Sequence, residues 1–124
     1  RGAVKLADAA AVTGVRRYLM VSSIGAHDPS SAGESMLPYL QAKAEADAYV
    51  RERGLDWTIV RPGSLTDEPG TGLVTVSREL GNRGPVPRAD VAAVLTACLT
   101  TPATVGVTFE LFAGDTPISK ALDF

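Results

Sequence analysis

The sequence predicts an α/β fold in which parallel strands alternate with helices. Residues 18–21 and 57–60 form two short apolar runs that do not alternate with polar residues, as is typical of strands covered on both faces. Helical segments separate these runs from each other and from a third strand at residues 106–112. Such alternation favours a parallel sheet with right-handed crossovers. Three main strands are few for an open sheet, which usually has about 4 to 6.

The first two helices have clear ends. Residues 2–13 end at Gly14, and residues 36–53 end at Gly54. Glycine readily adopts the left-handed backbone that closes a helix. In the second helix the apolar residues fall on neighbouring stripes, so we expect its charged residues, Asp47 among them, to be mostly solvated.

The later elements are shorter. We expect a short edge strand at residues 73–76 and a loop at residues 81–87. Asp90 is placed to cap a helix that runs through residues 91–99. A turn at residues 114–117 then leads into a short terminal helix.

Two loops have compositions that bear on function. Residues 26–35 are polar, include His27 and Asp28, and form the kind of loop that often covers a site. Gly70-Thr71-Gly72 lacks the third glycine and the following helix of a dinucleotide fingerprint. We therefore interpret it as a turn and not as a phosphate cradle.

Composition narrows the class of protein. The chain has 124 residues, is 45% hydrophobic and 21% charged, and has a net charge of −2, which is ordinary for a single globular domain. Without a basic run, neither nucleic acid nor an anionic membrane is implied as a partner, and no apolar run approaches the roughly 18 residues of a membrane span. One cysteine, Cys98, allows no internal disulfide, which fits the cytoplasm. A single histidine excludes a His/Cys metal cluster.

Tyr39 and Lys43 are the first candidates for chemistry. They stand four residues apart on the second helix, so the phenol and the ammonium share one face. A nearby positive charge favours tyrosinate, which makes Tyr39 a candidate general acid/base. The alternative is an ordinary tyrosine on the edge of an amphipathic helix with a solvated lysine nearby.

Two turns are candidates for ligand contact. Ser22 and Ser23 follow the first strand, and Pro62 and Gly63 follow the second. Open α/β sheets bind ligands at the carboxyl ends of their strands. Simple turn chemistry explains the serines about equally well, and Gly63 would let the backbone turn or a ligand approach.

Four segments in this order resemble the C-terminal half of an atypical short-chain dehydrogenase/reductase, of the NAD(P)H-binding, NmrA-like or NAD-dependent epimerase/dehydratase type. The segments are YLMVSSIG at residues 18–25, YLQAKAE at 39–45, WTIVRPG at 57–63 and RADVA at 88–92. The resemblance implies a Rossmann doubly wound sheet, of which residues 1–124 would form a partial domain supplying the last three main strands. The family's N-terminal glycine-rich loop is absent from these residues, and the chain starts at Arg1 within a predicted helix, so we expect a fragment.

The resemblance also implies roles for individual residues. Tyr39 would be the general acid/base, and Lys43 would hold the nicotinamide ribose and favour the ionised tyrosine. Ser22 would border the nicotinamide. Extended members usually carry a catalytic Ser or Thr where this chain has Ile24. Either Ser23 takes that role, or polarisation of the substrate carbonyl is weak.

The backbone of Pro62 and Gly63 would pack at the nicotinamide end of the cofactor, either NAD or NADP. The intact protein is then expected to be an oxidoreductase or epimerase with a small-molecule substrate. The alternatives are a non-catalytic, redox-sensing NmrA-like regulator and a fragment that is inactive alone. We expect weak or no NAD(P) binding by this chain alone, and a homodimer or association with the missing half through the exposed edge of the first strand. His27, Asp28, Met36 and the loop at residues 65–72 are candidates for the substrate pocket.

Overall fold

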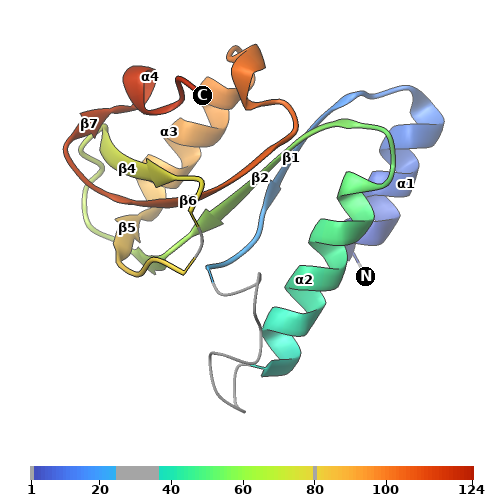
Figure 1. Ribbon diagram of the computed structural model, residues 1–124, viewed down its shortest axis with the longest axis horizontal. Helices are drawn as coiled ribbons and strands as arrows, with labels where there is room; N and C mark the ends of the chain where they lie inside the picture. Colours follow the sequence, from blue (N-terminus) through green and yellow to red (C-terminus); the bar gives the residue numbers. More distant parts are fainter. Residues whose placement is uncertain (1, 25–36, 80) are drawn as a thin grey trace.

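The computed structural model describes residues 2–24, 37–79 and 81–124. It has a sheet with helices packed on both faces, which confirms the α/β prediction (Figure 1). The helices are α1 (Gly2–Thr13), α2 (Leu37–Arg51), α3 (Arg88–Cys98) and α4 (Ile118–Ala121), with a 3-10 helix at Pro102–Thr104. The strands are β1 (Arg17–Val21), β2 (Asp56–Pro62), β3 (Ser64–Thr66), β4 (Leu73–Ser77), β5 (Pro85–Pro87), β6 (Val107–Ala113) and β7 (Thr116–Pro117).

The central sheet has the order β1-β2-β6-β4-β7. The three predicted main strands, β1, β2 and β6, are adjacent and parallel, with Tyr18 opposite Trp57 and Arg61 opposite Glu110. Among the described strands, β1 pairs only with β2. The prediction of an edge strand at residues 73–76 is wrong in one respect, because β4 lies inside the sheet, antiparallel to both β6 and the two-residue β7.

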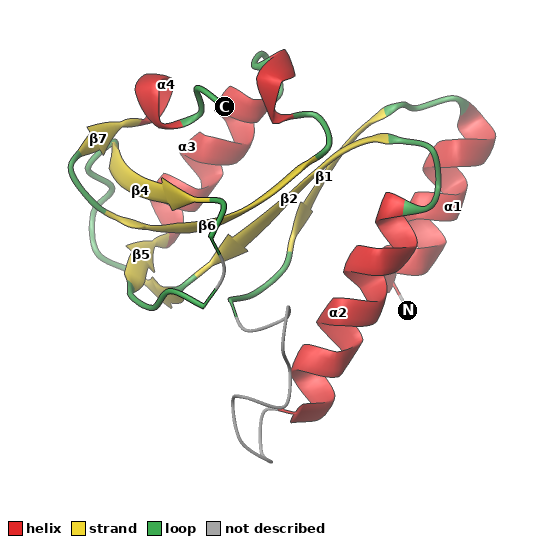
Figure 2. Cartoon of the chain, viewed as in Figure 1, coloured by secondary structure: helices red, strands yellow, loops and turns green. Residues whose placement is uncertain are grey.

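Neighbouring residues of β2 belong to different cores, because side chains alternate across a sheet. Ile59 packs in a cluster with Ala7 and Ala10 of α1 and Val50 of α2. Val60 packs on the other side, where the cluster includes α3 and Leu122. Figure 2 shows α1 and α2 on one side of the sheet and α3 and α4 on the other. Burial on both faces explains why the main strands are continuous apolar runs.

The predicted closures of the first two helices are confirmed. Gly14 follows α1 with φ of 82°, and Gly54 lies just beyond α2 with φ of 72°. Both values are in the left-handed region, where glycine has no steric penalty.

The predicted cap of the third helix is wrong. Asp90 lies within α3, whose N-cap is Pro87, with no side-chain cap. The buried carboxylate of Asp90 instead accepts hydrogen bonds from the backbone N–H groups of Thr71 and Gly72, each at 3.0 Å. Two amides of the Gly-Thr-Gly segment, those of Thr71 and Gly72, are therefore already held by an anion from the same chain.

The prediction of a loop throughout residues 81–87 is also wrong. Pro85–Pro87 forms β5, which pairs in parallel with β3 as a small second sheet. Prolines donate no N–H and are depleted from strands, so the residues Pro-Val-Pro provided no reason to predict a strand here. The sheets come close at Gly63, whose N–H donates to Leu111 O at 3.0 Å, while Ser64 N donates to Gly84 O at 3.1 Å.

Within residues 2–24, 37–79 and 81–124, no helix is both long and apolar enough to cross a membrane.

We expect Gly63→Ala to lower the free energy of unfolding by about 3 kcal/mol, because overpacking a buried site displaces its surroundings. A Cβ at Gly63 would lie 1.8 Å from Gly84 O, and this acceptor is backbone that cannot rotate away. Urea denaturation measures the change. Gly106→Ala is the control: it meets no atom within 4 Å and has only the strain of φ at 77°. Equal destabilisation by both variants would contradict the close-approach explanation.

Candidate functional site

The two turns predicted to contact a ligand lie side by side at the carboxyl ends of β1 and β2. Ser22 N donates to Val60 O at 2.7 Å, and Ile24 N donates to Pro62 O at 3.3 Å. These bonds continue the parallel ladder beyond the last residue of β1. The serine turn and the Pro62–Gly63 turn therefore share the edge at which open α/β sheets bind ligands.

Helix α2 brings Tyr39 and Lys43 to this edge. Lys43 Nζ donates a hydrogen bond to Val21 O, the last carbonyl of β1, at 3.2 Å. The same ammonium lies 5.8 Å from the centroid of the Tyr39 ring. Tyr39 is 49% exposed, so its phenol is accessible to a ligand. The i, i+4 spacing thus places both side chains together.

The two serines differ in their contacts. Ser22 is buried, and its hydroxyl donates to Asp47 Oδ2 at 2.8 Å. Ser23 is half-buried and its hydroxyl donates to the adjacent Ile24 O at 3.2 Å. The hydroxyl of Ser22 is therefore bonded within the protein interior, whereas that of Ser23 lies nearer to solvent.

Asp47 is the clearest residue that the sequence interpretation missed. Expected to be solvated, it is 0% exposed, and its Oδ2 also accepts from Arg61 Nη2 at 3.0 Å and Nε at 3.3 Å. Its Oδ1 is buried with no hydrogen-bond partner in the described part of the chain. One signal for this pair was available in the sequence: Arg61 directly follows the apolar run at residues 57–60, and a buried guanidinium requires an acidic partner.

The backbone at Pro62 and Gly63 is buried. Gly63 was expected to let the backbone turn or a ligand approach. The atom that comes close to it is Gly84 O of the same chain. Phe112 of β6 is also close, because its Cδ1 would lie 3.0 Å from a Cβ at Gly63. The edge therefore continues from the Tyr39–Lys43 pair, past Gly63, toward β6.

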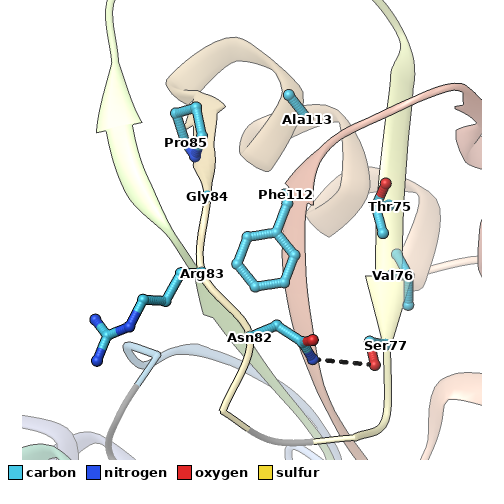
Figure 3. Close-up of a pocket in the computed structure, with 9 residues that line it drawn as sticks. All are labelled: Thr75, Val76, Ser77, Asn82, Arg83, Gly84, Pro85, Phe112 and Ala113. Carbon is cyan, nitrogen blue, oxygen red and sulfur yellow. Dashed lines mark hydrogen bonds between the residues drawn. The ribbon is translucent and has the colours of Figure 1, made fainter.

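A pocket of about 580 Å³ lies at this continuation, between β4, the end of β6 and residues 82–85 (Figure 3). Phe112 and Gly84 form part of its wall, and Thr75, Ser77, Asn82 and Arg83 contribute polar groups. This pocket was not predicted from the sequence, because its walls come from three separate segments. Of the residues predicted for a substrate pocket, His27, Asp28 and Met36 lie outside the described residues, and the loop at residues 65–72 does not line this pocket.

Within the described parts of the chain, no group of three or more His, Cys, Asp or Glu side chains is arranged to hold a metal ion. Cys98 is the last residue of α3 and is buried in the core, and burial raises the pKa of its thiol. A thiol held in its protonated form is a poor nucleophile.

A family model described as NAD(P)H-binding matches residues 1–102. The "Uncharacterized sugar epimerase YhfK" of Bacillus subtilis is 44% identical over 121 residues, which cover 98% of this chain and 56% of that protein. A solved structure from Bacillus halodurans, "Putative NAD-dependent epimerase/dehydratase", is 42% identical with a TM-score of 0.95, over 98% of this chain and 57% of its own. ChuY, an anaerobillin reductase from Escherichia coli O157:H7, is 28% identical with a TM-score of 0.77, over 90% of this chain and 56% of its own. The chain thus spans a little over half the length of these relatives.

We expect Asp47→Leu alone to lower the free energy of unfolding by about 3 to 5 kcal/mol, because it leaves the Arg61 guanidinium buried without a counter-charge. The double variant Asp47→Leu/Arg61→Met should lose less than the sum of the two single variants. Urea denaturation of all four proteins gives the coupling energy.

The matched control is the exposed pair Arg88–Asp67, which has a similar distance of 3.1 Å. Its removal should change stability little, because exposed ion pairs contribute little. Additive effects at positions 47 and 61 would show that the two side chains do not act as a unit.

Proposed function

This chain belongs to the NAD(P)H-binding family, and we propose that it forms the nicotinamide end of an NAD(P)-dependent oxidoreductase or epimerase. The observation that carries the proposal is the bond from Lys43 to the last carbonyl of β1. It holds the Tyr39–Lys43 pair beside the turns at the ligand-binding edge of the sheet. Hydride transfer is the chemistry that the nicotinamide supplies when bound.

The residues at the edge fit a dinucleotide. An ammonium has three N–H donors, and Lys43 donates one of them to Val21, which leaves donors for ribose hydroxyls. The exposed Tyr39 phenol lies beside the Lys43 ammonium and is accessible to exchange a proton with a substrate oxygen. Ser22, Pro62 and Gly63 would form the wall behind the nicotinamide.

Ser23 is the proposed partner of Tyr39 at the substrate oxygen. Ile24 has no hydroxyl, and the hydroxyl of Ser22 is engaged by Asp47, so Ser23 is the remaining hydroxyl of this turn. This small set of polar groups also supports a second candidate function, a redox-sensing regulator that binds the dinucleotide without turnover. The two candidates differ in whether Tyr39 is required for a reaction.

We expect Tyr39→Phe to abolish turnover while the affinity for NAD(P)H stays the same, because only the proton-transfer group is lost. Lys43→Ala should weaken both. Turnover is followed by the absorbance of reduced nicotinamide in the full natural protein. Candidate substrates start with the classes named for the relatives, sugars and anaerobillin.

Calorimetry with NADH and NADPH gives the affinities. The 124-residue chain itself should bind weakly, because a pyrophosphate is usually held by a glycine-rich loop that these residues lack. Gln41→Ala, an exposed position on the same helix, is the control. Unchanged turnover in Tyr39→Phe would remove Tyr39 from the mechanism.

We also propose that the chain associates through β1 and the neighbouring helix α1. Among the described strands β1 has one partner, so its other side presents backbone hydrogen-bonding groups. Both elements carry exposed apolar side chains: Val21 of β1 is 37% exposed, and Leu6 and Val12 of α1 are 62% and 85% exposed. A second copy would cover this surface.

We expect sedimentation equilibrium at micromolar concentration to give a dimer. Val12→Glu should shift it toward the monomer, because the dimer would have to bury the added charge. Leu99→Glu is the matched control, since Leu99 is 60% exposed just beyond α3, which packs on the opposite face of the sheet. A monomeric wild-type chain would contradict the proposed association.

A further inference from the structure

The peptide unit between Val21 and Ser22 is the point at which the Lys43 ammonium is attached to β1. A trans peptide directs its C=O and its N–H to opposite sides of the strand. The Ser22 N–H donates to Val60 O of β2 at 2.7 Å. The Val21 C=O, on the other side, accepts from Lys43 Nζ at 3.2 Å. The orientation of this one peptide therefore determines where the ammonium lies.

The bond from Lys43 to Val21 is a weak attachment by itself. It lies at the exposed surface, where water competes for both groups. A lysine ammonium is also a strongly hydrated charge at the end of a flexible stem. If the carbonyl is to hold the ammonium in one place, other groups must fix the peptide.

Asp47 supplies a second contact between α2 and the end of β1. It lies four residues after Lys43 on α2, so the two side chains lie on one face of the helix. Its Oδ2 accepts from the Ser22 hydroxyl at 2.8 Å, and this bond is buried. Two consecutive residues at the end of β1 are thus attached to two consecutive turns of α2.

A single oxygen atom of Asp47 joins the ends of both strands. The same Oδ2 accepts from Arg61 Nη2 at 3.0 Å and Nε at 3.3 Å, whereas Oδ1 has no hydrogen-bond partner among the described residues. The side chains of Asp47 and Arg61 are 0% and 4% exposed, so water cannot replace these bonds. Because the carboxylate is fully buried, it can affect a ligand only through the groups that it holds.

We propose that Asp47 is a positioning residue of the dinucleotide site. It acts through the Ser22 hydroxyl, which fixes the peptide between Val21 and Ser22, and that peptide holds the Lys43 ammonium where it meets a ribose hydroxyl. This inference rests on the proposed function, because it takes Lys43 as the residue that binds the ribose. It adds a separate requirement: the buried hydroxyl of Ser22 must affect the affinity through Lys43.

Ser22→Ala is the first test, because it removes the hydroxyl and leaves the ion pair of Asp47 in place. A substitution of Asp47 itself would leave the Arg61 charge buried alone. Hydrogen exchange is followed by NMR in the 124-residue chain without dinucleotide. We expect the protection factors of amides 22 and 24 to fall about fivefold, the effect of one ordinary hydrogen bond. The Asp56 amide, bonded at the other end of the same two strands, should keep its protection. Unchanged protection at residues 22 and 24 would overturn the proposal.

The effect on binding is measured by calorimetry with NADH and NADPH in the full natural protein. Ser22→Ala should weaken binding about fivefold in the wild-type background and less than about twofold in the Lys43→Ala background, because the peptide then has no ammonium to place. An equal loss in both backgrounds would indicate a direct contact of the hydroxyl with the dinucleotide and would overturn the proposal. Unchanged affinity in Lys43→Ala alone would contradict both this proposal and the proposed function.

Thr58→Val is the matched control. The buried hydroxyl of Thr58 donates to Thr104 O at 2.7 Å, toward the amino end of β2 and away from Lys43. Its removal should lower the urea midpoint about as much as Ser22→Ala does, since each variant loses one buried hydrogen bond. The affinity for the dinucleotide should stay the same. A matching loss of affinity in Thr58→Val would show that lowered stability alone explains the result, and would overturn the positioning role.

Discussion

The ion pair between Asp47 and Arg61 is the contact on which the site depends. Asp47 lies on α2, one turn beyond Lys43, and Arg61 lies on β2, immediately before the Pro62–Gly63 turn. Because both groups are almost fully buried, neither can be separated from the other without leaving a charge in the core. The helix is thereby fixed in rotation and translation relative to the strand ends. Ser22 joins the same carboxylate, so the turn after β1 is fixed by it as well.

The sequence was sufficient for the parallel part of the fold. Continuous apolar runs and glycine-terminated helices depend on local chemistry and on burial at both faces, and residues 2–13 matched α1 at both ends. The Tyr39–Lys43 pair was predictable for the same reason, because helical spacing alone brings the side chains together. The predictions that were wrong concerned residues whose partners lie in distant segments of the chain. An aspartate in a helix, such as Asp47, is expected to face solvent unless its buried partner is known. Asp90 stands where a helix cap is expected, and only the fold shows that it bonds to Thr71 instead.

Three buried acids have a common role in this molecule. Asp47 holds the serine turn, Asp90 holds the amides at residues 71 and 72, and Glu110 holds those at residues 81 and 82. Asp90 and Glu110 accept from backbone N–H groups, and Asp47 accepts from the Ser22 hydroxyl and the Arg61 guanidinium. These hydrogen bonds compensate in part for the loss of water around a buried charge. The segments between strands are thus ordered by single side chains of the packed elements, while Tyr39 and Arg83 remain exposed.

Gly63 is a point of close packing at this edge, since its missing side chain leaves room for both Gly84 O and the Phe112 ring. A larger residue at position 63 would push the segment at residue 84 outward and reshape the wall of the pocket. The residues around Gly63 and those of the pocket wall therefore cannot change independently during evolution. A lineage that reshapes this pocket must therefore keep the glycine and vary positions such as 75 and 83, whose exposed side chains can change without moving the backbone at residues 62 and 63.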